Sequence, residues 1–225
     1  MAAPAPKYGT NPGKNNWPKG VLEVSETIVI DQEGVFINGC KPAGRPTNNL
    51  TGAVVPGECT IQRAPGFTGP QIHFVSAPDA LLSGGALWNV ILPGPGIVLE
   101  IDNPDHFDLG HVAFPQGGTV KVGWIGAGKP SPTTVPGYLE AHGILASSYA
   151  APVFQIAGMT QSRIHDAYFS RGGSVPPISV DADTNKLFID QIITDGSDPS
   201  LVTSLDTTAK GGSICVGRVW GSADW

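Results

Sequence analysis

LGHVAF (residues 109–114) and IHDAYF (residues 164–169) follow one pattern, in which apolar residues open and close the hexapeptide and a polar residue stands third. FIDQII (188–193) and CVGRVW (215–220) extend the series, with glycine third in the last copy. These copies end 55, 24 and 27 residues apart, so the first interval leaves room for one more repeat. A period in the twenties is typical of a solenoid, whose repeats bury their apolar faces only against their neighbours.

The sequence before each hexapeptide repeats with the same offset. VLEI (98–101) lies 55 residues before VFQI (153–156). From residue 21 onward, short runs rich in β-branched and aromatic residues alternate with PG, GP and GG turn signals, which is typical of strands. Leucine-rich repeats have a similar period but need regularly placed leucines and an asparagine that this sequence lacks. The repeat therefore predicts an all-β parallel β-helix.

The alignment of the four hexapeptides predicts one continuous core, because inward side chains of a parallel stack contact the same position one repeat away. Gln191 and Arg218 depart from the apolar pattern, which we interpret as a change of cross-section or a contact with another subunit. The side chains expected to point inward are Leu109, Val112, Phe114, Ile164, Phe169, Phe188, Ile193 and Trp220.

The first twenty residues differ from the rest in composition. They contain four prolines, three lysines and almost no aliphatic side chains, so they cannot form a core of their own. We expect an extended N-terminal arm over residues 1–20 and one β-helix domain over residues 21–225. Tyr8 and Trp17 could anchor the arm on a partner, and a disordered leader with incidental aromatic residues is the competing interpretation. Trp225 ends the sequence, where we expect it to cap the solenoid or pack against a partner subunit.

Charge and hydropathy narrow the range of partners. The chain has 13 Lys and Arg against 19 Asp and Glu, a net charge of −6, so we expect no nucleic-acid partner. No run approaches the roughly 18 apolar residues of a membrane helix, and the N-terminus lacks the apolar segment of a secretory signal, so we expect a soluble protein made in the cytoplasm. Cys40, Cys59 and Cys215 do not have the spacing of a zinc site, and a Cys40–Cys59 bridge is left open.

The apolar–x–Asn/Asp–apolar–x–apolar pattern, together with LWNVILPGPGIVLEIDN at residues 87–103, resembles the coil pattern of right-handed parallel β-helix proteins. This superfamily contains pectate lyases, polygalacturonases and phage tailspikes. The resemblance covers residues 59–220 and implies a right-handed β-helix and, for its virion members, a homotrimer. It implies no particular activity, because the superfamily includes lyases, hydrolases, epimerases and non-enzymatic virion proteins.

Two aspartates are the candidate catalytic pair. The alignment places Asp166 and Asp190 at equivalent positions of adjacent repeats, about 5 Å apart at the backbone. Two such carboxylates could serve as the acid and base of glycoside cleavage. We favour the other interpretation, that both are turn residues bonded to the local backbone. His165 is expected to point away from Asp166, because neighbours on a strand alternate between its faces.

The stretch from Asp102 to His111 has the composition of a metal site but matches no metal-binding spacing. Strand alternation is expected to place His106 and Asp108 on one face and His111 on the other. We interpret DNPDH (102–106) as a solvated turn that precedes a strand over residues 107–114, and we expect neither a metal nor a cofactor, since the sequence has no nucleotide-binding motif.

Two functions agree with these features. The first is a non-enzymatic structural or attachment protein of a virion, such as a phage capsid decoration protein or a short head or tail spike. Its expected partners are copies of itself in a homotrimer, a major capsid protein and a surface polysaccharide. The alternative is a polysaccharide lyase or glycoside hydrolase, with a lectin-like sugar-binding module as a third option. The low surface charge and the lack of a catalytic cluster favour the virion protein.

Overall fold

The computed structural model describes residues 15–16, 20–39, 59–77, 80–123, 135–170, 172, 175–180, 184–195 and 214–221. Every regular element in these ranges is a β-strand. No helix that could cross a membrane is found among the described residues. The strands are β1 (Asn15–Asn16), β2 (Gly20–Val24), β3 (Ile28–Ile30), β4 (Phe36–Asn38), β5 (Cys59–Arg63), β6 (Ile72–Phe74), β7 (Leu82–Trp88), β8 (Gly96–Asp102), β9 (Pro104–Gly110), β10 (Ala113–Phe114), β11 (Gly118–Gly123), β12 (Gly137–His142), β13 (Leu145–Ser147), β14 (Phe154–Ala157), β15 (Arg163–Ser170), β16 (Ile178–Val180), β17 (Leu187–Asp195), β18 (Ile214–Val216) and β19 (Val219–Gly221).

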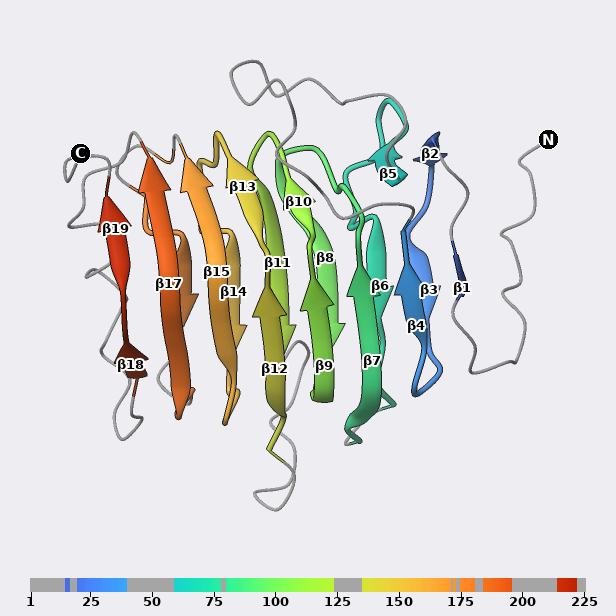
Figure 1. Cartoon of the computed structure of the whole chain (residues 1–225). Helices are drawn as coiled ribbons and strands as arrows, with labels where there is room; N and C mark the ends of the chain where they lie inside the picture. Colours follow the sequence, from blue (N-terminus) through green and yellow to red (C-terminus); the bar gives the residue numbers. More distant parts are fainter. Residues whose placement is uncertain are drawn as a thin grey trace.

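Two curled parallel sheets face each other. In the larger, sheet A, strands pair in the order β1-β4-β7-β9-β12-β15, with β17 next to β15 and β18 and β19 next to β17. In the smaller, sheet B, the order is β3-β6-β8-β11-β14-β16. Figure 1 shows the strands of sheet A side by side with those of sheet B behind them. From β3 to β17 the chain passes alternately between the sheets, so each strand pairs with the strand one circuit later.

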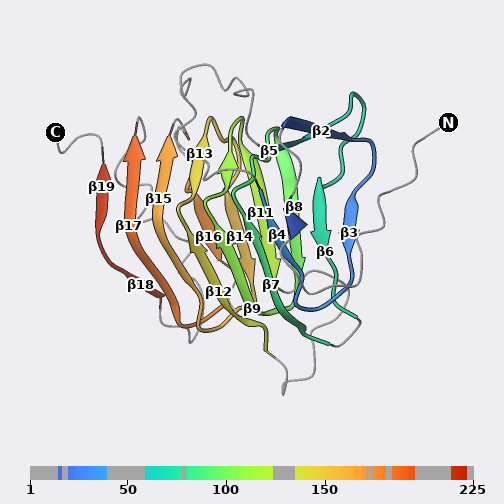
Figure 2. The same cartoon turned by 45° about the vertical axis from the view of Figure 1, so that its right-hand side comes forward.

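A third line of parallel pairing runs beside these two sheets. It begins with β2 and β5, continues through bridges of Ile91 to Thr60 and Ala113, and reaches β13. The second half of β15 joins this line, because its residues Tyr168–Ser170 pair with β13 while its first half pairs with β12. Figure 2 shows β2 and β5 at one end of this line. Each complete circuit therefore contributes three short stretches of parallel strand.

Register across sheet A is set by one row of inward apolar side chains. Leu87 pairs with Leu109, Leu109 with Ala141, Ala141 with Ile164 and Ile164 with Ile189. All five are at most 1% exposed. The 55-residue offset between Leu109 and Ile164 predicted from sequence is confirmed, with Ala141 in the intervening circuit.

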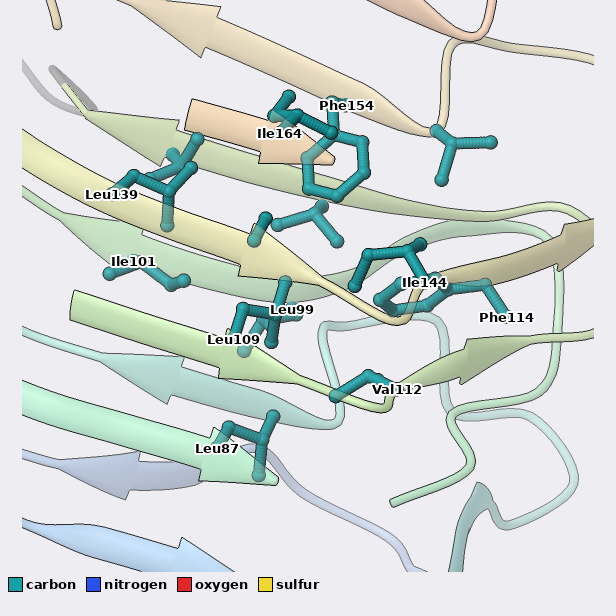
Figure 3. Packing of buried hydrophobic residues seen from close by; sticks show 14 of the residues in the cluster. Leu87, Leu99, Ile101, Leu109, Val112, Phe114, Leu139, Ile144, Phe154 and Ile164 are labelled. Carbon is teal, nitrogen blue, oxygen red and sulfur yellow. The ribbon is translucent and has the colours of Figure 1, made fainter. Parts of the chain in front are cut away.

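The core fills the space between the sheets. Figure 3 shows Leu99 and Ile101 of sheet B packing towards Leu109 and Leu139 of sheet A. Aromatic side chains occupy the larger gaps, and the Phe74 and Phe107 rings meet edge to face with centroids 4.8 Å apart. The largest side chains with less than 2% exposure are Phe74, Phe107, Phe114, Phe154, Phe169, Ile61, Ile72, Leu87, Leu92, Leu99, Ile101 and Leu109.

A left-handed residue ends the straight part of five successive strands of sheet A, β7, β9, β12, β15 and β17. Asn89, His111, Gly143, Asp166 and Gln191 have φ values of 58°, 53°, 62°, 52° and 56° and lie in successive circuits. A residue in this conformation breaks the strict alternation of faces. Asp166 therefore points outward, as His165 does. After Asp166 the chain turns into the third line of pairing.

The predicted alignment is wrong from β17 onward by one residue. Ile189, not Phe188, lies beside Ile164, because the inward positions of β17 are Leu187, Ile189 and Ile192. A slip of one residue moves a whole strand to the other face. Phe188, Ile193 and Trp220, which were expected in the core, are therefore 51%, 38% and 36% exposed. The other five predicted core residues, Leu109, Val112, Phe114, Ile164 and Phe169, are buried.

The corrected register also explains the two polar residues that departed from the pattern. Gln191 follows Asp190 and occupies the left-handed position, and Arg218 stands one circuit further on. Both point outward, so neither marks a change in cross-section. Cys59 is disulfide-bonded and Cys215 is a free thiol. Cys40 and the predicted arm side chains lie outside the described residues.

The register predicts that replacing two phenylalanines by alanine lowers the free energy of unfolding by very different amounts. Phe169→Ala should lower the free energy of unfolding by about 3–5 kcal/mol, since it empties a fully buried site. Phe188→Ala should cost less than about 1 kcal/mol, because half of that ring is in solvent. Urea denaturation of both variants measures the difference. Equal losses would contradict the register of β17.

Candidate functional site

Polar and aromatic side chains cover the outer face of sheet A where β7, β9, β12, β15 and β17 lie side by side. They arise from the alternation of each strand, whose inward residues form the core, and from the left-handed residue that adds another outward position. We call this surface the strip. Its members are Trp88, Asp108, His111, Glu140, His142, His165, Asp166, Asp190 and Gln191.

His165 is held between two carboxylates. Its Nε2 lies 2.6 Å from Glu140 Oε1, and its Nδ1 lies 2.6 Å from Asp166 Oδ2. A neutral imidazole can donate only one hydrogen bond, so both contacts are hydrogen bonds only when the ring carries two protons. The expectation that His165 and Asp166 point apart is wrong, because the left-handed backbone of Asp166 returns its carboxylate to the side of the histidine.

Aromatic rings line up along the strip from one circuit to the next. The His142 and His165 rings are stacked with centroids 5.7 Å apart and an interplanar angle of 18°. Trp88 meets His142 edge to face at 5.6 Å, and His111 meets His142 at 5.2 Å. His142 Nε2 also lies 3.2 Å from Asp108 Oδ1. His111 and Asp108 therefore lie on the same side of the sheet, contrary to the prediction from strand alternation.

Asp190 has a different environment. Its Oδ1 accepts hydrogen bonds from the backbone N–H groups of Gln191 and Arg218, at 2.9 and 2.8 Å, and its Oδ2 lies 3.5 Å from Arg218 Nη2. The backbone hydrogen bond from Arg218 is the main reason that the pKa of Asp190 is lowered, and the Arg218 side chain and Gln191 N–H add to it. Asp190 is thus bonded to backbone, as predicted, but it lies within strand β17 and not in a turn, and one of its two backbone donors belongs to the next circuit.

The two candidate catalytic aspartates are not at equivalent positions. Asp190 lies beside His165 in the next strand, and Asp166 lies beside the left-handed Gln191. With its amide turned to satisfy both neighbours, Gln191 donates to Asp166 Oδ1 and accepts from Arg218 Nη2. Tyr8, Trp17 and Trp225, the other predicted site residues, lie outside the described residues.

Sequence reasoning missed three members of the strip. Asp108 was placed on the predicted strand 107–114 without a partner, and Glu140 and His142 were not singled out. The signal was present, because Ala141 occupies the missing repeat between Leu109 and Ile164, and its two neighbours must point outward. The glycine at 143, where other circuits have Asn, His, Asp or Gln, concealed this repeat.

The strip offers hydrogen-bond acceptors and ring faces to solvent. The side chains of Asp108, Glu140 and Asp166 are 38%, 44% and 51% exposed, and each contacts a histidine through one oxygen. Within the described ranges, no three His, Cys, Asp or Glu side chains are arranged to hold a metal ion. Carboxylates beside stacked rings suit a ligand with hydroxyl groups and apolar faces.

A second charged cluster lies on the outer face of sheet B. His73 Nε2 is 3.1 Å from Asp102 Oδ2, and its Nδ1 is 3.8 Å from Glu100 Oε2. Lys121 Nζ is 3.8 Å from Glu100 Oε1. The hydrogen bond to Asp102 raises the pKa of His73, the two carboxylates add Coulomb attraction, and burial and Lys121 oppose it. This cluster joins three adjacent strands and is structural.

Comparisons with protein-family models, with curated proteins and with solved structures find no match.

The His73 cluster should make stability depend on pH. The raised pKa means that the folded state binds a proton more tightly than the unfolded chain, so the stabilisation is complete below the ordinary histidine pKa of about 6.5. It is lost as the pH rises through the higher pKa of the folded state. The loss of unfolding free energy in His73→Gln should therefore be larger at acidic than at alkaline pH. In an Asp102→Asn background this pH dependence should shrink, and an unchanged profile would argue against the assignment.

Proposed function

We propose that the chain is a right-handed parallel β-helix. Three lines of exclusively parallel pairing in the described residues, a chain that alternates between sheets, and one inward row of apolar residues support this fold. A right-handed connection is also the strong preference for parallel strands joined by a crossover.

We propose that the protein is a non-enzymatic structural and attachment protein of a virion, and that the strip contacts a surface polysaccharide. The observation that carries this proposal is the pairing of histidines with protein carboxylates. His165 has no free ring nitrogen, and His142 shares its Nε2 with Asp108. His165, with both ring nitrogens engaged, is suited to rigid recognition, whereas a general base needs a nitrogen that can reach the substrate proton.

Hydrolysis of glycosides is the alternative, and the geometry disfavours it. Its general acid must stay protonated near neutral pH, which requires a raised pKa. The pKa of Asp190 is lowered instead, by backbone and guanidinium donors. Asp166 contacts His165 with one oxygen and Gln191 with the other, so it holds the strip in shape.

We also propose that copies of the chain associate, in a homotrimer, and dock on a capsid protein. Val216 occupies the inward row beside Ile189, yet it is 42% exposed, because no described strand covers it. An interior position left open at the end of a stack needs a cap or a neighbouring subunit. Size measurement by light scattering distinguishes a trimer from a monomer.

The proposal predicts binding without cleavage. Against a panel of bacterial capsular and O-polysaccharides, the purified protein should bind at least one, and Trp88→Ala or His142→Ala should weaken that binding about tenfold, a change of about 1.4 kcal/mol. Tyr138→Ala removes an aromatic ring that is 45% exposed outside the strip, and should leave binding unchanged.

The same mixtures of protein and polysaccharide test for enzymatic cleavage. The wild type should release no new reducing ends or unsaturated sugars from any polysaccharide of the panel. The Asp166→Asn and Asp190→Asn variants should therefore give the same amounts of both products as the wild type. Products that appear with the wild type and vanish with either variant would make the protein an enzyme. A wild type that binds no polysaccharide in the panel would count against the attachment role of the strip.

A further inference from the structure

A hollow of about 580 Å³ lies where the strip reaches the last described strands. Residues of β15, β17 and β18 and of the turn after β18 line it. Those that the argument uses are Arg163, Phe188, Asp190, Gly217 and Arg218.

The missing side chain of Gly217 opens this hollow. A Cβ at Gly217 would lie 2.5 Å from Asp190 Oδ1 and 3.0 Å from its Cγ, closer than real Cβ contacts. The equivalent outward position carries rings in β7, β12 and β15 (Trp88, His142 and His165), a glycine in β9 (Gly110) and Asp190 in β17. The last described circuit therefore leaves open, at Gly217, the surface that the rings of His142 and His165 cover in β12 and β15.

Positive charge dominates the hollow. The side chain of Arg163 makes no ion pair or hydrogen bond with the described residues, although Glu140 is its direct neighbour in β12 and instead binds His165. Arg218 is 63% exposed on its side chain. The single carboxylate here, Asp190, already accepts two backbone hydrogen bonds and faces Arg218. Two guanidinium groups can thus reach an incoming anion.

An apolar surface lies between these cations. Phe188 stands directly between Arg163 and Cys215 in the outward row, with half of its surface exposed. The Arg218 guanidinium lies 5.8 Å from the ring centroid of Trp220, which orients it beside a second aromatic face. A flat ring bearing a carboxylate would match this combination, since guanidinium binds carboxylate through two parallel hydrogen bonds.

We propose that the hollow is a carboxylate subsite for a sugar acid, with Arg163 and Arg218 binding the carboxylate and Phe188 packing against the sugar ring. This deepens the proposed function and rests on it for the identity of the polymer. The acceptor-rich part of the strip, at Asp108 and Glu140, would repel the same carboxylate. A bound polysaccharide therefore lies with an acidic sugar unit over β17 and β18 and with neutral sugar units over β9 and β12.

The subsite can be tested with a small probe and without knowledge of the polymer. Sodium D-glucuronate is titrated into the full-length protein, and the Nε–Hε signals of the arginines are followed by NMR, with assignments from Arg163→Gln and Arg218→Gln. The Arg163 and Arg218 signals should shift saturably with glucuronate and should not shift with D-glucose at equal concentration. Gly217→Ala should abolish the shifts of the Arg163 and Arg218 signals, because its methyl group meets Asp190 in the hollow.

Matched variants separate specific binding from general charge. Lys186→Gln removes an exposed cation near β17 that does not line the hollow, and should leave the glucuronate affinity unchanged. Arg163→Gln should weaken it about tenfold, the loss expected for one charge-assisted hydrogen bond. Equal effects of both substitutions, or shifts with glucose as large as with glucuronate, would overturn the subsite. Glucuronate binding by a protein that captures no polysaccharide would retain the subsite and refute the proposed attachment function instead.

Discussion

The structure depends on the in-register stacking of one left-handed residue in each of five successive strands of sheet A, β7, β9, β12, β15 and β17. A non-glycine residue with positive φ is sterically disfavoured, and Asn and Asp tolerate it best. Asn89, His111, Asp166 and Gln191 accept this conformation because it turns the chain from sheet A into the third line of pairing. The same conformation places two successive side chains on the outer face. The turn that closes each circuit and the polar strip on its surface have one cause.

This constraint explains which parts of the fold were predictable. The spacing of Leu109 and Ile164 predicted parallel stacking correctly, since buried apolar residues must meet their counterparts one circuit away. The slip at Phe188 arose because FIDQII and IDQIIT are both plausible as inward runs, and the second ends in Thr194, a buried hydroxyl residue. Hydrophobicity alone favours the first run. Only the pairing of Ile189 with Ile164 shows that Phe188 points to solvent.

The candidate site was less predictable than the fold, for a related reason. Strand alternation implies that neighbours point apart, and in β15 the rule fails at the left-handed residue, where His165 and Asp166 point the same way. The contacts of His142 with Asp108 and of His165 with Glu140 join residues from different circuits. They follow from the register, which had first to be known. The His142 and His165 side chains are held by carboxylates of their own or a neighbouring circuit, and a rigid surface suits recognition of a repetitive polymer.

Gln191 has a left-handed backbone and ends the straight part of β17. Glycine and valine at this position distinguish a left-handed residue from an extended one, because glycine tolerates positive φ and valine does not, whereas valine is the better residue within a strand. Both substitutions lose the same contacts with Asp166 and Arg218. We predict that Gln191→Gly unfolds at a higher urea concentration than Gln191→Val. A higher midpoint for Gln191→Val would contradict the left-handed stack and the account of fold and strip that depends on it.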